Sequence, residues 1–106
     1  DDLKRTYNYV PITDDTDPAN HKYFRGVQGT FWAEHVADNA LLEYLALPRL
    51  MAVAEAGWSP QSAKNFDSFV RRMQADTTLL ELGGYRYSPH YLKPAPPRPA
   101  KAAGKQ

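Results

Sequence analysis

The chain has 106 residues and no cysteine, and 42% of its residues are hydrophobic and 12% aromatic. This length allows at most one small domain with a thin margin of buried surface, so a piece of a larger fold is an open alternative. Lys and Arg number 13 and Asp and Glu number 12, and the net charge of +1 predicts no nucleic-acid or anionic-membrane surface. The lack of cysteine excludes a disulfide framework and a thiolate metal site.

Irregular structure is expected for the first part of the chain. Residues 7–23 mix aromatics, prolines and acids without a period of 3.6 or 2, so they predict a long connecting loop. A calcium-binding loop is one interpretation of the cluster formed by Asp14, Asp15 and Asp17. The glycine and glutamate of an EF-hand do not follow at the required offsets, so a solvated turn is the better interpretation. The chain carries no readable signal peptide, and no apolar run reaches the about 20 residues of a membrane span.

A β-strand is predicted next, over residues 26–32, where β-branched and aromatic residues lie between a polar loop and a helix start. Gly26 and Gly29 would weaken a free strand, so they imply a close backbone approach. One strand cannot form a sheet. The protein is therefore either helical with an extended segment, or the C-terminal end of a TIM (β/α)8 barrel of the α/β class whose other strands are not in this chain.

Helices are predicted for most of the remainder. Asp38 or Asn39 supplies the N-cap of a helix over 39–47 with a leucine-rich face, and Pro48 either kinks this helix or starts the next, which runs to Trp58. A third helix is predicted over 63–82. Its expected inner side is formed by Phe66, Phe69, Val70, Met73 and Leu80, and Gly83 and Gly84 are expected to close it.

The last fourteen residues differ from the rest in composition. Residues 93–106 contain four of the nine prolines, a charge of +4 and no large apolar side chain, which leaves −3 for residues 1–92. A segment of this kind cannot bury enough surface to offset its ordering entropy, so we expect a disordered tail or linker. A polyproline ligand for an SH3-type groove is the functional alternative.

The most informative side chains directly follow the predicted strand. Trp32, Glu34 and His35 would lie at the strand's C-terminal end, which is the active-site end of a barrel strand. An aromatic ring can pack against the C–H face of a sugar while a neighbouring carboxylate accepts hydrogen bonds from its hydroxyls. Trp32 as core and Glu34 as a carboxylate favouring the helix start are the structural alternatives. For His35, a capping or supporting role is preferred over a catalytic one.

Three stretches resemble a known family: YNYVP, VQGTFWAEHV and YLALPRLMAVAEAGWS. Their order and spacing, over residues 3–92, are similar to the C-terminal end of the catalytic barrel of glycoside hydrolase family 20, the β-N-acetylhexosaminidases. A W-x-E signature ends the last barrel strand in that family, and here it is formed by Trp32 and Glu34. The following helix carries a P-R-x-x-A-x-A-E-x-x-W-S pattern, matched by Pro48, Arg49, Ala52, Ala54, Glu55, Trp58 and Ser59.

The resemblance implies roles for two residues. Trp32 would form part of the pocket wall for a terminal N-acetylated sugar, and Glu34 would bind its 4- and 6-hydroxyls. Bond cleavage in the family uses an Asp–Glu pair from an earlier strand together with the acetamido group of the substrate, an exception to the two-carboxylate scheme. The resemblance places that Asp–Glu pair upstream of this chain, together with a tyrosine and an arginine of the family site. This chain resembles about the last quarter of the domain and is therefore expected to be inactive alone. No cofactor or metal is implied.

Several interpretations stay open at this point. Residues 1–92 are taken as barrel and 93–106 as tail, with the rest of the barrel and an N-acetylhexosamine glycan as partners. A lacto-N-biosidase that releases a disaccharide and a non-enzymatic helical interaction module are the alternative functions. GlcNAc or GalNAc preference and oligomeric state are open, and only the resemblance suggests a periplasmic or secreted location. Structural roles are expected for Arg49, Glu55, Trp58, Tyr85, Tyr87 and Tyr91.

Overall fold

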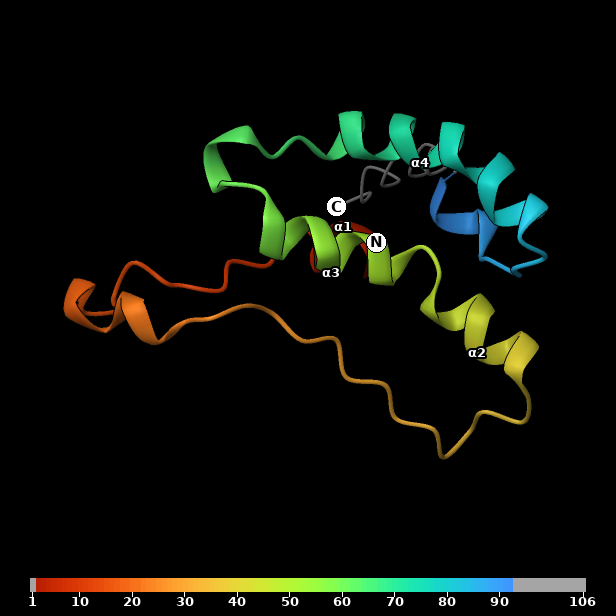
Figure 1. Ribbon diagram of the computed structural model, residues 1–106, viewed down its shortest axis with the longest axis horizontal. Coiled ribbons are helices and arrows are strands. Elements are labelled where there is room, and N and C mark those ends of the chain that lie inside the picture. The colour runs from red at the N-terminus through yellow and green to blue at the C-terminus, as the bar shows by residue number, and fades with distance from the viewer. Residues whose placement is uncertain (1, 93–106) are drawn as a thin grey trace, which may run out of the picture.

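The computed structural model describes residues 2–92, and the predicted tail lies outside this range. Within it are four α-helices: α1 (Asp2–Tyr7), α2 (Asn39–Ala46), α3 (Arg49–Trp58) and α4 (Phe66–Leu82). Three short 3-10 helices complete the regular structure: η1 (Pro18–Tyr23), η2 (Gln61–Ala63) and η3 (Pro89–Leu92). Figure 1 shows α4 along one side of the molecule, α3 in the middle, and a long extended stretch between η1 and α2 along the other side.

The predicted strand at 26–32 is wrong as a hydrogen-bonded element. Residues 24–33 form an extended segment, hereafter the 24–33 segment, and no part of residues 2–92 is a β-strand. The reason is physical, because an extended chain becomes a strand only when a neighbour pairs its backbone N–H and C=O groups. No second extended stretch pairs with it within the described residues. The local structure is thus an unpaired extended segment followed by helices, which matches only part of the predicted barrel fragment.

The 24–33 segment nevertheless packs on α3 in a defined register. A methyl group placed on Gly29 would lie 3.7 Å from Cγ2 of Val53, whereas one placed on Gly57 would overlap Cγ2 of Val27. Moving forward from Val27 to Gly29 in the segment thus corresponds to moving back from Gly57 to Val53 in α3, so the two run antiparallel. The lengths agree, because two extended residues advance about 6.6 Å and four helical residues about 6 Å. An antiparallel course is also the arrangement of a strand and a helix in a βα unit.

Helix boundaries follow the expected capping chemistry. Asp38 is the N-cap of α2, and its Oδ1 accepts a hydrogen bond of 2.8 Å from the backbone N–H of Leu41. Pro48, preceded by a cis peptide bond, separates α2 from α3 and is the N-cap of α3 rather than its first residue. The third predicted helix begins at Phe66 rather than at 63, because Asn65 caps it with a hydrogen bond of 2.9 Å from the N–H of Ser68.

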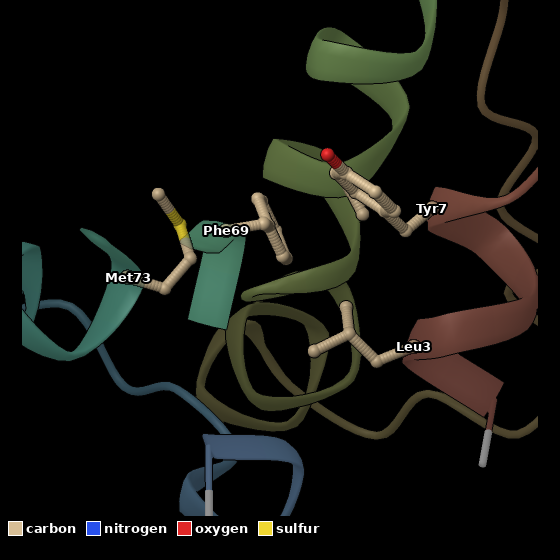
Figure 2. Packing of buried hydrophobic residues seen from close by; sticks show 5 residues of the cluster. Leu3, Tyr7, Phe69 and Met73 are labelled. Atoms are coloured by element: carbon tan, nitrogen blue, oxygen red, sulfur yellow. The ribbon is translucent and has the colours of Figure 1, made fainter. Parts of the chain in front are cut away.

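The core of the described chain lies where α1, α3 and α4 meet. Leu3 and Tyr7 of α1 pack with Ala52 of α3 and with Phe69 and Met73 of α4, and the labelled side chains converge in Figure 2. The Tyr7 and Phe69 ring centroids are 4.8 Å apart. Helix α1 was not predicted, since residue 7 was assigned to a loop. The predicted inner side of α4 is confirmed for its first two turns, where Phe66 and Val70 also pack against this cluster, whereas Leu80 is half-buried and lies outside it.

A polar network of Tyr7, Glu55 and Arg72, hereafter the Tyr7–Glu55–Arg72 network, links the helices around this core. The Tyr7 hydroxyl donates to Glu55 Oε1 at 3.2 Å and accepts from the backbone N–H of Asn65 at 2.9 Å. Arg72 on α4 donates to the same Glu55 oxygen at 2.6 Å. Burial raises the pKa of the Tyr7 phenol above its ordinary value of 10.0, and the Glu55 carboxylate adds to the rise while the Asn65 N–H opposes it. One glutamate thereby joins three helices.

The molecule is open rather than closed around its core. Its radius of gyration is 17.3 Å, against about 13 Å for a compact domain of 100 residues. Many large apolar side chains are solvent-exposed: Tyr9, Val10, Tyr23, Phe24, Phe31, Trp32, Leu42, Leu50, Trp58, Leu79, Leu82 and Tyr85. This shape fits a piece of a larger fold better than an autonomous helical module. Within residues 2–92, no helix combines the length and apolarity needed to cross a membrane.

Candidate functional site

Trp32 lies near the end of the 24–33 segment, on its open side. Val27 and Gly29 both face α3, so alternation along an extended chain turns residues 28, 30 and 32 away from that helix. The Trp32 side chain is 77% exposed, so it belongs to no core within residues 2–92. An indole in this position has a free ring face for a ligand.

Glu34 and His35 occupy a turn that immediately follows Trp32. The backbone N–H of Val36 donates to the carbonyl oxygen of Ala33 at 3.1 Å, which closes the turn and leaves both middle side chains exposed. Within residues 2–92, Glu34 makes no hydrogen bond or ion pair. Its carboxylate is consequently available to accept hydrogen bonds from a ligand.

The structure weakens the interpretation of Glu34 as a helix-start carboxylate. Asp38 caps α2, the first turn of α2 contains no acidic residue, and Glu34 precedes the first helical residue, Asn39, by five positions. The field of a helix end acts mainly within the first turn. Asp38 therefore performs the helix-start function, and Glu34 has no structural task of that kind.

Other residues singled out in the sequence have mixed outcomes. Arg49 pairs with Asp2 of α1 at 2.9 Å, and Glu55 belongs to the Tyr7–Glu55–Arg72 network, so the predicted structural roles of both are confirmed. Tyr87 packs against the core cluster. Trp58 and Tyr85 are 91% and 53% exposed within residues 2–92, so their packing against other parts of a barrel stays a prediction. The side chain of Tyr91 lies outside the described part.

Two residues of structural importance were missed by sequence reasoning. Tyr7 and Asn65 join α1 to the start of α4, through the hydrogen bond from the Asn65 N–H to the Tyr7 hydroxyl. The only available signal for α1 was the spacing of Leu3 and Tyr7 by four residues, which is one helical turn. A six-residue helix is too short for such a spacing to stand out.

The aspartate cluster is a turn, as predicted. Asp17 is the N-cap of η1, and its Oδ1 accepts a hydrogen bond of 2.9 Å from the N–H of Ala19. Thr13 donates its hydroxyl to Asp15. Within residues 2–92 there is no group of three or more His, Asp or Glu side chains with the geometry of a metal site. The loop of residues 7–23 is thus irregular apart from the end of α1 and the six residues of η1.

Two hollows flank the contact between the 24–33 segment and α3, with volumes of about 260 and 340 Å³. Both are lined by Val27 and Ala56, and neither lining includes Trp32 or Glu34. The candidate site residues therefore form an open surface rather than a closed pocket. A closed sugar pocket would need walls from residues outside the described range.

Comparisons with known proteins agree with this geometry. The family described as glycosyl hydrolase family 20, catalytic domain, matches residues 1–61. The chain is 35% identical over 85 residues to a beta-hexosaminidase of Porphyromonas gingivalis, which covers 80% of the chain and 11% of that relative. It is 40% identical over 79 residues to a beta-hexosaminidase of Akkermansia muciniphila, covering 69% of the chain and 16% of the relative. A beta-N-acetylhexosaminidase of Cellulomonas fimi is 33% identical over 73 residues, covering 67% and 15%.

An extended segment with a helix packed antiparallel to it is the arrangement of one βα unit of a barrel. The chain belongs to glycosyl hydrolase family 20, whose catalytic domain is a TIM barrel. It spans only 11% and 16% of the lengths of the first two relatives. A match that covers 80% of the chain has to continue past residue 61 into α4, so α4 shares this similarity.

Proposed function

We propose that this chain is part of a β-N-acetylhexosaminidase that removes terminal non-reducing N-acetylhexosamine residues from glycans. Membership of glycosyl hydrolase family 20 and the names of the similar proteins support this activity. In this proposal Trp32 and Glu34 supply one wall of the sugar pocket. The observation that carries it is the Trp–x–Glu pair at the end of the 24–33 segment, with the indole 77% exposed and the carboxylate without a partner among the described residues.

The two side chains have distinct proposed tasks. The Trp32 ring packs against the apolar face of the pyranose, which excludes water on that side and fixes the tilt of the ring. Glu34 accepts hydrogen bonds from the 4- and 6-hydroxyls, and bonds of this charge-assisted type are stronger than neutral ones. Together they orient the sugar in the pocket. Neither side chain transfers a proton in this scheme.

Cleavage itself is proposed to be substrate-assisted and to retain the anomeric configuration. The carbonyl oxygen of the substrate acetamido group attacks the anomeric carbon while an acid protonates the departing glycosidic oxygen, and water then opens the bicyclic intermediate. The acid and the carboxylate that orients the acetamido group are assigned to other parts of the barrel. The contribution of this chain is binding energy and orientation, which hold the glycosidic bond in reach of the acid.

The test uses the complete enzyme that contains this chain, with aryl N-acetyl-β-glucosaminide as substrate. Each lost hydrogen bond to the charged carboxylate costs about 1.5–3 kcal/mol, so the loss of both in Glu34→Ala lowers kcat/KM by roughly a hundred- to ten-thousandfold. The pH profile of kcat keeps its acid limb, because the group that donates the proton is unchanged. Glu34→Gln, which keeps one acceptor oxygen and the side-chain volume, gives a smaller loss.

The decisive measurement is a cycle that pairs the mutation with a substrate that lacks the 4-hydroxyl. Glu34→Ala costs this deoxy substrate less than it costs the full sugar, since one of the two hydrogen bonds is already missing. His35→Ala is the matched control, because His35 is exposed in the same turn and has no proposed contact with the sugar. A coupling near zero in a correctly folded variant contradicts the role of Glu34. A wild-type enzyme without activity on the N-acetyl substrate contradicts the function itself.

A further inference from the structure

Gly57 is the second-to-last residue of α3, one position before Trp58. Glycine is a poorer helix former than alanine, by up to about 1 kcal/mol, so its presence calls for a local reason. The backbone gives none, because Gly84 is the only glycine with a positive φ within residues 2–92. A close packing contact supplies the reason instead.

The contact is with Val27 of the 24–33 segment. A methyl group at position 57 would lie well under 3.0 Å from Cγ2 of Val27, and 3.5 Å from both its Cβ and its Cγ1. Valine is branched at Cβ and has little freedom about χ1, so its methyl groups cannot simply fold away as the end of a long side chain would. The missing side chain of Gly57 is therefore what allows α3 and the segment to approach this closely.

The two partners of this contact differ in how firmly they are fixed. On its other side α3 is fixed by the core, where Ala52 is buried against α1 and Glu55 joins the Tyr7–Glu55–Arg72 network. Within residues 2–92 the 24–33 segment makes no such polar links to the core, and two hollows lie beside Val27. Added volume at position 57 therefore forces α3 and the segment apart at Val27.

The same segment ends in the residues assigned to the sugar pocket. Trp32 is five residues beyond Val27, and Glu34 follows in the adjoining turn. We infer that Gly57 is a positioning residue, whose lack of a side chain sets the distance between α3 and the 24–33 segment and thereby the position of Trp32 and Glu34 against the sugar. This inference rests on the proposed function. Gly57 itself does not contact the substrate in this scheme.

The test is a double-mutant cycle of Gly57→Ala and Val27→Ala in the complete enzyme, read by Tm and by KM and kcat on aryl N-acetyl-β-glucosaminide. With Val27 present, Gly57→Ala lowers the Tm and raises KM, with a loss in kcat/KM on the order of tenfold because the pocket wall is displaced. In the Val27→Ala background the same change raises the Tm, since alanine is the better helix former and the overlapping methyl is gone. KM there stays near the value for Val27→Ala alone.

Gly29→Ala is the matched control. It adds the same methyl group in the same contact surface, but that methyl meets Val53 at an ordinary 3.7 Å, so Tm and KM change little. Equal effects of Gly57→Ala in both Val27 backgrounds overturn the inference, and so does a lower Tm with unchanged KM, which would make Gly57 merely structural. Failure of the proposed function is recognised separately, because the wild-type enzyme would then not hydrolyse the N-acetyl substrate, and the positioning role would fall with it.

Discussion

Tyr7→Phe is the substitution that most directly tests how the three core helices are joined. The Tyr7 side chain is 0% exposed, and its hydroxyl makes both hydrogen bonds that link α1 to Glu55 and to the start of α4. Phenylalanine keeps the ring and its packing against Phe69 but deletes the hydroxyl. The change therefore removes the polar links while it leaves the apolar core in place.

The expected loss follows from the two bonds. A hydrogen bond to a charged group is worth about 1.5–3 kcal/mol, and an unsatisfied buried N–H costs about 1–3 kcal/mol. The Glu55 bond belongs at the low end, because it is 3.2 Å long and Glu55 keeps Arg72 at 2.6 Å. The Asn65 N–H also loses its 2.9 Å acceptor, at a cost toward the low end because this bond is only part-buried. Together we expect a loss of about 2–3 kcal/mol in the free energy of unfolding, which lowers Tm by roughly 4–12 °C in a barrel-sized domain.

The assay is thermal unfolding of the complete enzyme, with Tyr87→Phe as the matched control. Tyr87 also donates its hydroxyl to a glutamate, Glu81, at 2.8 Å, but at the surface. We expect its loss to lower Tm by less than half as much, since water replaces an exposed partner. Equal shifts for the two variants, or no shift for Tyr7→Phe, would refute the reasoning.

Alkaline pH gives a second readout of the same prediction. Because burial raises the pKa of the Tyr7 phenol above 10.0, the neutral phenol stabilises the folded state fully below pH 10.0, and this contribution is lost as the pH rises through the folded pKa. The Tm of the wild type should fall more steeply above pH 10 than that of Tyr7→Phe. Lys64, whose ammonium lies 5.3 Å from the Tyr7 ring, is common to both proteins and does not contribute to the difference in a first approximation.

Two further predictions concern the chain itself and the start of α2. Residues 1–106 expressed alone should not hydrolyse an aryl N-acetyl-β-glucosaminide, because the proposed chemistry uses an acid outside this chain; turnover that a single substitution within the chain abolishes would contradict this. Asp38→Ala should lower the free energy of unfolding by about 1 kcal/mol in the complete enzyme through loss of the Leu41 cap, measured by denaturant unfolding, whereas Asp38→Asn should retain most of it.

The sequence predicted best those features that depend on local chemistry. Asp38 was one of two predicted caps for α2, a break or kink was predicted at Pro48, and Gly83 and Gly84 were predicted to end α4. Each of these assignments follows from short-range hydrogen bonding or φ restriction. The leucine-rich and phenylalanine-rich helices were likewise predicted from their 3.6-residue period. Their boundaries differ by at most a few residues.

The features that depend on distant partners were predicted less well. The strand at 26–32 required neighbours that the described chain does not contain, although the segment is extended, as a strand is, and lies against α3. Helix α1 has only six residues, and it owes its stability to the burial of Leu3 and Tyr7 against elements about fifty residues away. Glu55 could be marked as structural, but its partners Tyr7 and Arg72 could not be named, since nothing in their spacing along the chain joins them.

The helix pattern that carries the family resemblance is explained largely by packing. Arg49 pairs with Asp2 of α1, Ala52 is buried against the same helix, and Glu55 binds both α1 and α4. At about 100° per residue, Ala52 and Glu55 lie on a different side of α3 from Val53 and Gly57, which contact the 24–33 segment. One side of α3 thus fixes the helix, and the other supports the segment that ends in Trp32. The long motif specifies a rigid support, whereas the short Trp–x–Glu signature, exposed and without partners in the described chain, carries the proposed contact with the sugar.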